Sequence, residues 1–332
     1  MRQLRILFIL LVFTCHNLSA QFPLSGRQYV DRMNLSGGFP EDLLSTRSVV
    51  FFSPDFSEKE LKQMQEYFQR TGVDAVSYFA LDMFTAGRDV TRGFFEFFSR
   101  REISNLIFAE KFSNGYRMSI TTFNGKDNIT TEGQPAWSIS NRLLTELLKT
   151  LNRDALAALK RGNLLVNEFP ETDQIINLIT GKRNEFYAGD MKVDLVAIPK
   201  FGVDSLDQQL ADLLEEHFPF EYRLVEPNAN EKDLRKQGML YIFGMVHARA
   251  IVTRQLLQYP SSPAETAFVS ITFPADNPQA KNIGQNTPVF KVYFKHIDSG
   301  NFFLGNKWDA DTSWQQALLN HIKGMKAELR LN

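Results

Sequence analysis

The sequence predicts an α/β fold (α+β in the alternative convention) made of two tandem modules, each with a mixed sheet and packed helices. Three observations support this prediction. Strand-like apolar runs alternate with amphipathic helical runs along the chain. The predicted elements follow the same order in both halves. The chain has 332 residues, a length that suits two domains.

The first half begins with a buried-strand run and a turn that leads into a helix. Ser57 and Glu60 have capping-box spacing, so each side chain can satisfy a free backbone N–H at the helix start. Asn124-Gly125, a dipeptide typical of hairpins, predicts the turn that ends the strand at 116–123. The expected elements in order are a strand at 48–52, a helix from 57, a strand at 75–79, a helix at 90–101, strands at 105–110 and 116–123, and a helix after Trp137.

The second half repeats this order. Ser205 and Gln208 again have capping-box spacing. This repetition predicts a duplicated module; two unrelated modules that share common turn residues are the alternative. The expected elements are a strand at 193–198, a helix from 205, a strand at 220–225, a helix at 231–237, strands at 239–245 and 290–297, and a helix after Trp314.

The predicted organisation has five parts. They are a signal peptide at 1–20, an N-terminal extension at 21–46, a first module at 47–160, a linker at 161–190 and a second module at 191–332. The linker mixes charge with glycine and proline, and a short helix is expected at 171–179. The second module carries an insertion at 250–288, which contains Pro260, Pro263, Pro274 and Pro278 and a strand-like run at 267–273.

The first twenty residues have the layout of a secretory signal peptide. Arg2 and Arg5 precede an apolar run at 6–13, and small residues end the segment before Gln21. The run is too short for a membrane span. We therefore expect export, to the periplasm or the cell exterior, with no transmembrane span after cleavage. Cys15 is the only cysteine, so the mature chain has no disulfide; a lipid anchor on Cys15 is the alternative.

Composition narrows the classes of partner. The formal charge is −1, without the basic excess that nucleic-acid binding requires. The chain has 29 Phe against 9 Tyr and 3 Trp, and phenylalanine without a polar group is expected in the core. The run at 94–98 (FFEFF) is predicted to fill the first core, with an exposed aromatic patch as the alternative.

No motif in the chain nominates a catalytic, metal-binding or cofactor-binding residue. His247 and His296 lie in or beside strands and could approach one another across a sheet, but no zinc-binding spacing supports a metal site. The nucleophile elbow, the Walker loop and the dinucleotide fingerprint are all missing. We expect a chain without cofactor or metal, more consistent with a binding protein than with an enzyme.

Three short motifs in the second half carry a resemblance. Residues 193–201 (VDLVAIPKF), 241–244 (YIFG) and 297–300 (IDSG) resemble the signatures of a small periplasmic α/β module. That module occurs in curli-secretion lipoproteins, penicillin-binding-protein activators and the amino-terminal domain of TolB. The likeness covers roughly 191–329 and implies protein–protein work at the cell envelope. Ser299 stands where the hairpin commonly has Thr, and no convincing lipobox is present. The leader also resembles those of exported Bacteroidetes proteins.

The insertion is the expected binding surface, because insertions add surface without disturbing a core. Arg254, Tyr259 and Phe273 are the predicted partner-binding residues, since arginine and aromatic side chains are favoured interface anchors. The expected function is a non-catalytic envelope protein that binds another protein or supports an envelope assembly. The alternative is a periplasmic enzyme or small-ligand-binding protein with a site between the two modules.

Overall fold

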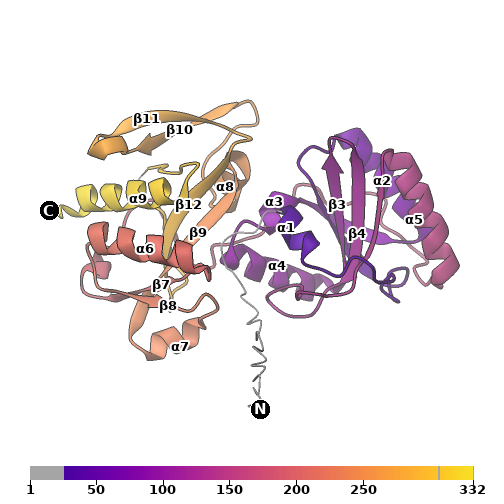
Figure 1. The fold of residues 1–332 in the computed structure, drawn as a ribbon, viewed down its shortest axis with the longest axis horizontal. Coiled ribbons are helices and arrows are strands. Elements are labelled where there is room, and N and C mark those ends of the chain that lie inside the picture. The colour runs from indigo at the N-terminus through magenta and orange to yellow at the C-terminus, as the bar shows by residue number, and fades with distance from the viewer. Residues whose placement is uncertain (1–25, 306, 332) are drawn as a thin grey trace, which may run out of the picture.

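The computed structural model describes residues 26–305 and 307–331. The predicted signal peptide and Cys15 lie outside the described residues. Figure 1 shows two modules side by side, with helix α4 (Arg88–Arg101) between their sheets. A two-stranded hairpin, β10 (Ala267–Thr272) and β11 (Gln279–Gly284), lies over α9 (Trp314–Leu329) of the second module. The fold is α/β, with mixed-orientation sheets, as predicted.

The first module contains a five-stranded sheet of order β2-β1-β3-β4-β5. β1 is parallel to β2 and β3, whereas β3–β4 and β4–β5 are antiparallel. α2 and α5 pack on one face, and α3 and α4 pack on the other. The elements are α1 (Gly26–Asp31), β1 (Arg47–Phe52), α2 (Glu58–Thr71), β2 (Asp74–Ala80), α3 (Leu81–Phe84), α4 (Arg88–Arg101), β3 (Ile103–Phe112), β4 (Gly115–Thr122), β5 (Trp137–Asn141) and α5 (Leu144–Ala158).

The second module contains a six-stranded sheet of order β6-β13-β12-β9-β7-β8, with α6 and α9 on one face. The insertion adds α8 and the separate β10–β11 hairpin. The elements are β6 (Arg183–Asn184), β7 (Leu195–Pro199), α6 (Asp204–His217), β8 (Tyr222–Val225), α7 (Glu231–Lys236), β9 (Met239–Arg249), α8 (Ala250–Leu256), β10 (Ala267–Thr272), β11 (Gln279–Gly284), β12 (Pro288–His296), β13 (Phe302–Phe303) and α9 (Trp314–Leu329), with short 3₁₀ turns at Gly189–Lys192 and Pro274–Asp276.

The two sheets share their strand order and orientations. β8-β7-β9-β12-β13 corresponds to β2-β1-β3-β4-β5, with two parallel pairs followed by two antiparallel pairs. The same irregularity in register also occurs in both modules. The pairing of β1 with β3 leaves Ser104 of β3 without an opposite residue, and the pairing of β7 with β9 does the same for Leu240 of β9. Descent of both modules from one duplicated ancestor stays a prediction.

One hydrophobic cluster joins the modules. Phe94 and Phe98 of α4 belong to the same buried cluster as Val246 of β9 and Tyr293 of β12. The prediction that the aromatic run at 94–98 fills the core is confirmed, because Phe94 and Phe98 are fully buried and Phe97 is nearly so. This core therefore packs against both sheets rather than against the first alone.

Two local predictions fail for reasons of hydrogen bonding. Ser57 and Glu60 form the predicted capping box, but Ser205 caps nothing, because α6 begins one residue earlier after Val203. Asp207 instead accepts hydrogen bonds from the backbone N–H groups of Phe201 and Gly202, at 2.6 and 3.3 Å. The side chain that ties this loop to its helix is therefore the carboxylate inside the first turn.

The linker is also different from the prediction. Residues 171–179 form no helix, because Glu171 pairs with the edge of β2. The Glu171 N–H donates to the Val76 carbonyl and the Tyr78 N–H donates to the Glu171 carbonyl. Further on, Arg183–Asn184 joins the opposite sheet as β6. The linker is thus extended because both sheets use it as an edge strand.

The first hairpin turn lies eleven residues before its predicted position at Asn124-Gly125. Asn-Gly occurs twice in the chain, at Asn114-Gly115 and at Asn124-Gly125. In the structure Ser113 and Asn114 form the turn, since Phe112 of β3 lies opposite Gly115 of β4. The later pair lies in the loop between β4 and β5.

Candidate functional site

A small crevice lies between the modules at the carboxyl end of β7. α6 packs on one face of the second sheet and α7 on the other, so the chain leaves β7 and enters β9 on opposite faces. Such a topological switch point is the usual ligand position in open α/β sheets. Residues 199–201 and 242–245 line the crevice from the second module, and residues 87–89 line it from the first.

The first module fills much of this crevice with the start of α4. The His247 N–H donates to the Ala86 carbonyl at 2.8 Å, so the two modules share a backbone hydrogen bond. A Cβ on Gly87 would lie 2.6 Å from the Met245 carbonyl oxygen. Glycine at this position therefore permits a backbone approach that a side chain would block.

Four charged side chains and one tyrosine form a polar network beside the crevice, which we call the inter-module network: Asp89, Arg92, Glu231, Tyr293 and Lys295. The Tyr293 hydroxyl donates to Asp89 at 2.5 Å. Glu231 accepts from Arg92 at 2.6 Å and from Lys295 at 3.1 Å. Each carboxylate thus has partners from both modules.

The network also sets the protonation of its carboxylates. Burial alone would raise the pKa of Asp89, but Lys295, Arg88 and the Tyr293 hydroxyl together hold that pKa below its ordinary value. Burial acts in the same direction on Glu231, and Lys295 and Arg92 lower its pKa. Both groups are therefore ionised at neutral pH, and neither has the raised pKa expected of a general acid.

Gly244 makes the network possible. A Cβ on this residue would lie 2.2 Å from the Tyr293 ring, which crosses the strand above it. The register places Tyr293 directly opposite Gly244 in the β9–β12 pair. The glycine of the YIFG motif is thus explained by packing, since it lets a buried tyrosine reach the other module.

The space left in the crevice is small. Its volume, about 50 Å³, holds one or two water molecules. Arg88 Nη1 and Asp89 Oδ1 are buried there without a hydrogen-bond partner among the described residues. The crevice can hold ordered water or a very small polar ligand, and it would have to open for anything larger.

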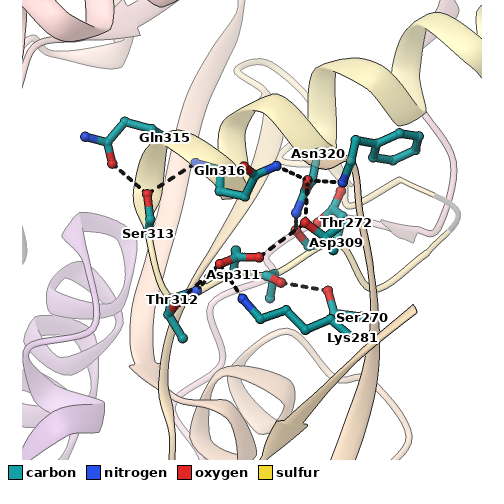
Figure 2. Close-up of polar contacts among 12 residues, drawn as sticks. Ser270, Thr272, Lys281, Asp309, Asp311, Thr312, Ser313, Gln315, Gln316 and Asn320 are labelled. Atoms are coloured by element: carbon teal, nitrogen blue, oxygen red, sulfur yellow. Dashed lines mark hydrogen bonds and ion pairs between the residues drawn. The ribbon is translucent and has the colours of Figure 1, made fainter. Parts of the chain in front are cut away.

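The insertion hairpin is anchored on α9 by polar contacts, shown in Figure 2. Asn320 Oδ1 accepts from the Thr272 hydroxyl at 3.1 Å and from the Phe273 N–H at 2.9 Å. Lys281 of β11 pairs with Asp311 at 2.9 Å, and the Ser270 hydroxyl donates to the Ala310 carbonyl at 2.6 Å. These contacts fix the inner face of the hairpin, so its outer face and edge are what it presents to solvent.

The three predicted partner-binding residues occupy different environments. Tyr259 is buried and packs against Trp308. Arg254 is partly exposed, and its guanidinium lies over aromatic rings and donates to the Pro260 carbonyl at 2.5 Å. Phe273 is partly exposed and lies on the far side, where its backbone is held by Asn320. The structure brings Arg254 and Tyr259 together and leaves Phe273 apart; their part in partner binding stays a prediction.

The predicted approach of two histidines does not occur. His247 lies opposite Phe290 and His296 lies opposite Tyr241, so they stand at opposite ends of the β9–β12 pair. The His247 ring instead stacks on Phe290 at 3.8 Å. Across residues 26–305 and 307–331, no three His, Cys, Asp or Glu side chains are grouped as metal ligands.

A buried ionic cluster went unnoticed in the sequence. Lys291 is fully buried and pairs with Asp309 at 2.6 Å, and Asp309 also bonds the buried His321 at 2.9 Å. Lys291 and Lys295 lie four residues apart on one face of a mainly apolar strand, and this spacing was the available signal. Lys291, Asp309 and His321 are all buried, and we assign the cluster to stability.

Comparison with protein families and with curated proteins gives no match for this chain. No protein-family model matches it, and no curated protein is significantly similar to it. Across the part of the chain that the structure describes, no helix combines the length and the hydropathy needed to cross a bilayer.

Proposed function

We propose that this chain is a non-catalytic, exported envelope protein that binds another protein through the edge of its β10–β11 hairpin. The proposal rests on the outer edge of β11, where backbone N–H groups have no partner among the described residues. The Ile271 N–H of β10 donates to the Trp308 carbonyl at 2.8 Å, away from β11. Ala280 lies opposite Ile271 in the antiparallel pair, so the Ala280 N–H also points away from the partner strand, toward the free edge of β11. The N–H of Asn282, two residues further along β11, points the same way.

The free edge can accept an additional strand. No described residue pairs with the backbone N–H of Ala280 or Asn282 on that side. On the outward face, Val269 is 56% exposed beside Asn282. Edge strands of this kind bind extended peptides by strand addition, with main-chain hydrogen bonds supplying affinity and alternate side chains supplying specificity.

Two further observations favour binding over catalysis. The inter-module crevice is small, and ion pairs between the modules balance the charges of Asp89 and Glu231. The three short motifs of the second half resemble those of envelope modules that act through protein contacts. Export to the periplasm or the cell exterior is part of the proposal, and the basic and apolar pattern of residues 1–20 supports it.

Site-specific photo-crosslinking in the producing cells tests this function. A photoreactive residue at position 282 is expected to give a discrete adduct with another protein. Ala280→Pro should abolish that adduct, because proline removes an outward N–H without breaking the β10–β11 ladder. A photoreactive residue at Val193, which is 86% exposed on another surface, serves as the control. Equal adducts at 193 and 282, or an adduct that survives Ala280→Pro, would contradict strand addition.

A ligand site in the crevice is the second candidate. Arg88 Nη1 and Asp89 Oδ1 are buried there without a hydrogen-bond partner among the described residues, at the position where α/β sheets usually bind ligands. A small polar solute that stabilises the wild-type chain but not Asp89→Asn would favour this function over protein binding.

A further inference from the structure

Beneath the hairpin, two arginines and two aromatic residues form what we call the arginine–aromatic cluster: Arg183, Arg254, Tyr259 and Trp308. The Arg254 guanidinium carbon lies 5.1 Å from the centre of the Trp308 ring and 5.5 Å from that of Tyr259. The Arg183 guanidinium carbon lies 4.5 Å from the Tyr259 ring centre. The Tyr259 and Trp308 rings meet edge to face at 5.2 Å. The four side chains therefore form one contiguous cluster.

Each member of the cluster carries a buried donor that has no acceptor among the described residues. These donors are Arg183 Nη2, Arg254 Nε, the Tyr259 hydroxyl and Trp308 Nε1. Tyr259 is 8% exposed and Trp308 is 6% exposed, so water has little access to either group. Leaving a buried donor unsatisfied is costly. Four such donors in one place indicate that an acceptor is missing.

The two guanidinium groups of the cluster differ in their carboxylate contacts. Arg183 has a carboxylate partner in Glu185, but no described carboxylate lies within ion-pair distance of Arg254. Burial lowers the pKa of Arg254, and the more distant carboxylates of Glu265 and Glu185 act in the opposite direction. Arg254 stays partly exposed, and the exposed loop at 260–267 lies beside it. An anion can therefore reach the guanidinium from solvent.

We propose that the arginine–aromatic cluster binds an oxyanion, a carboxylate or phosphate group. Water suits the site less well, because a water molecule must also donate hydrogen bonds and here meets mainly donors. An oxyanion accepts from all of them, and guanidinium groups bind carboxylate and phosphate most strongly. This inference goes beyond the proposed function, since the cluster stands on its own contacts and does not depend on the β11 edge.

The Trp308 indole N–H gives a direct readout of binding. The chain has three tryptophans, so the ¹⁵N-labelled protein gives three indole signals, and Trp308→Phe assigns the one that matters. We would titrate the full mature chain with inorganic phosphate and, separately, with N-acetyl-glutamate, at constant ionic strength, up to about 50 mM. The Trp308 signal should shift with saturation, while those of Trp137 and Trp314 stay in place.

Three variants separate binding from structure. Arg254→Met should weaken the anion affinity about tenfold or more, because it removes the unpaired charge. Tyr259→Phe should weaken it about threefold, yet leave the melting temperature without anion unchanged, since the hydroxyl has no protein partner to lose. Arg70→Met is the matched control, because Arg70 also lies over a tyrosine ring, that of Tyr67. It should leave the affinity unchanged.

The outcomes are distinguishable. Saturation by phosphate alone identifies a phosphate group as the ligand, and saturation by N-acetyl-glutamate identifies a carboxylate; either supports the site. A Trp308 signal that does not move, or that moves equally in Arg254→Met, overturns it. Because the titration needs no partner protein, its failure leaves strand addition at β11 standing, and a failed crosslink leaves the oxyanion site standing.

Discussion

The two sheets share a strand order, yet one face of each is covered in different ways. In the first module, the face that carries Phe51 and Phe108 packs under its own α3 and α4. In the second, the corresponding helix α7 has only six residues and covers the edge near Ala197 and Ile242. The rest of that face packs against α4 of the first module. The second module therefore depends on the first to bury its sheet.

One pair of opposite residues differs between the two sheets in which strand carries the large side chain. Phe108 lies opposite Ser119 in the first sheet, and Gly244 lies opposite Tyr293 in the second. Each pair joins a large residue to a small one, but the large residue changes strand. In the first sheet the ring fills its own core, whereas Tyr293 reaches across to Asp89. Because the large residue lies on the other strand in the second sheet, this pair forms a contact between the modules instead of filling the core of one module.

A cation recurs two residues before Ser119 in β4 and two residues before Tyr293 in β12. Arg117 and Lys291 occupy equivalent places in β4 and β12. Arg117 has two carboxylates, Glu110 at 2.6 Å and Asp31 at 2.7 Å, and is 15% exposed. Lys291 is fully buried and has Asp309 as its only described carboxylate partner. The second module therefore carries the more vulnerable charge.

Removal of the carboxylates should show this difference most strongly. Asp309→Ala should cost about 3–5 kcal/mol in the free energy of unfolding, because it leaves Lys291 buried and unpaired. Glu110→Ala should cost about 1–3 kcal/mol, because Arg117 keeps Asp31. Urea unfolding measures both. Replacement of both partners, Lys291→Met with Asp309→Leu, should recover much of the loss. A larger cost for Glu110→Ala would reverse the comparison.

Gly244→Ala tests the reversed pair. The new methyl group overlaps the Tyr293 ring, so we expect a loss of about 2 kcal/mol. In a Tyr293→Ala background the same change should cost less than about 0.5 kcal/mol, because the overlap is gone. Gly189→Ala is the control, since nothing lies within 4 Å of its added Cβ. Additive effects of the Gly244 and Tyr293 changes would show that the ring does not require the glycine.

Asp89→Asn probes the contact between the modules through pH. The folded-state pKa of Asp89 is lowered, so its contribution to stability is present above its unfolded pKa, near 4, and disappears as the pH falls through the folded value. At pH 7 the variant should lose about 1–3 kcal/mol. Below about pH 4 the gap between variant and wild type should close. A gap that is constant from pH 7 to pH 3 would show that the charge of Asp89 is irrelevant.

The helix starts give the smallest expected difference. Ser57→Ala should destabilise by about 1 kcal/mol, because it removes a capping box. Ser205→Ala should stay within about 0.5 kcal/mol, because this hydroxyl caps nothing. Thermal unfolding of the two variants side by side gives the comparison. Equal losses in the two variants would show that Ser205 caps its helix as Ser57 does.

The sequence predicts what local chemistry decides. Strand-like runs, the Ser57 cap and the buried phenylalanines follow from residue type and spacing alone. The prediction fails where a distant partner decides. Residues 171–179 are extended because β2 offers them an edge, and Asp207 replaces Ser205 because two loop N–H groups face it.

The candidate sites depended even more on distant contacts. Asp89 and Glu231 meet only because α4 and α7 reach the same crevice, and no spacing in the chain relates them. Arg254 and Tyr259 could be nominated from the insertion by residue type. Arg183 and Trp308, which complete their cluster, come from the linker and from the segment before α9.

The central claim is that the two modules form one cooperative unit, because α4 covers both sheets. Two single-tryptophan variants of the full chain test it, one keeping Trp137 in β5 and the other Trp314 in α9. Equilibrium urea unfolding, followed by fluorescence, then reports each module separately. We predict coincident transitions with the same midpoint. Two separate midpoints would contradict the claim and show that the second sheet does not need the first module's helix.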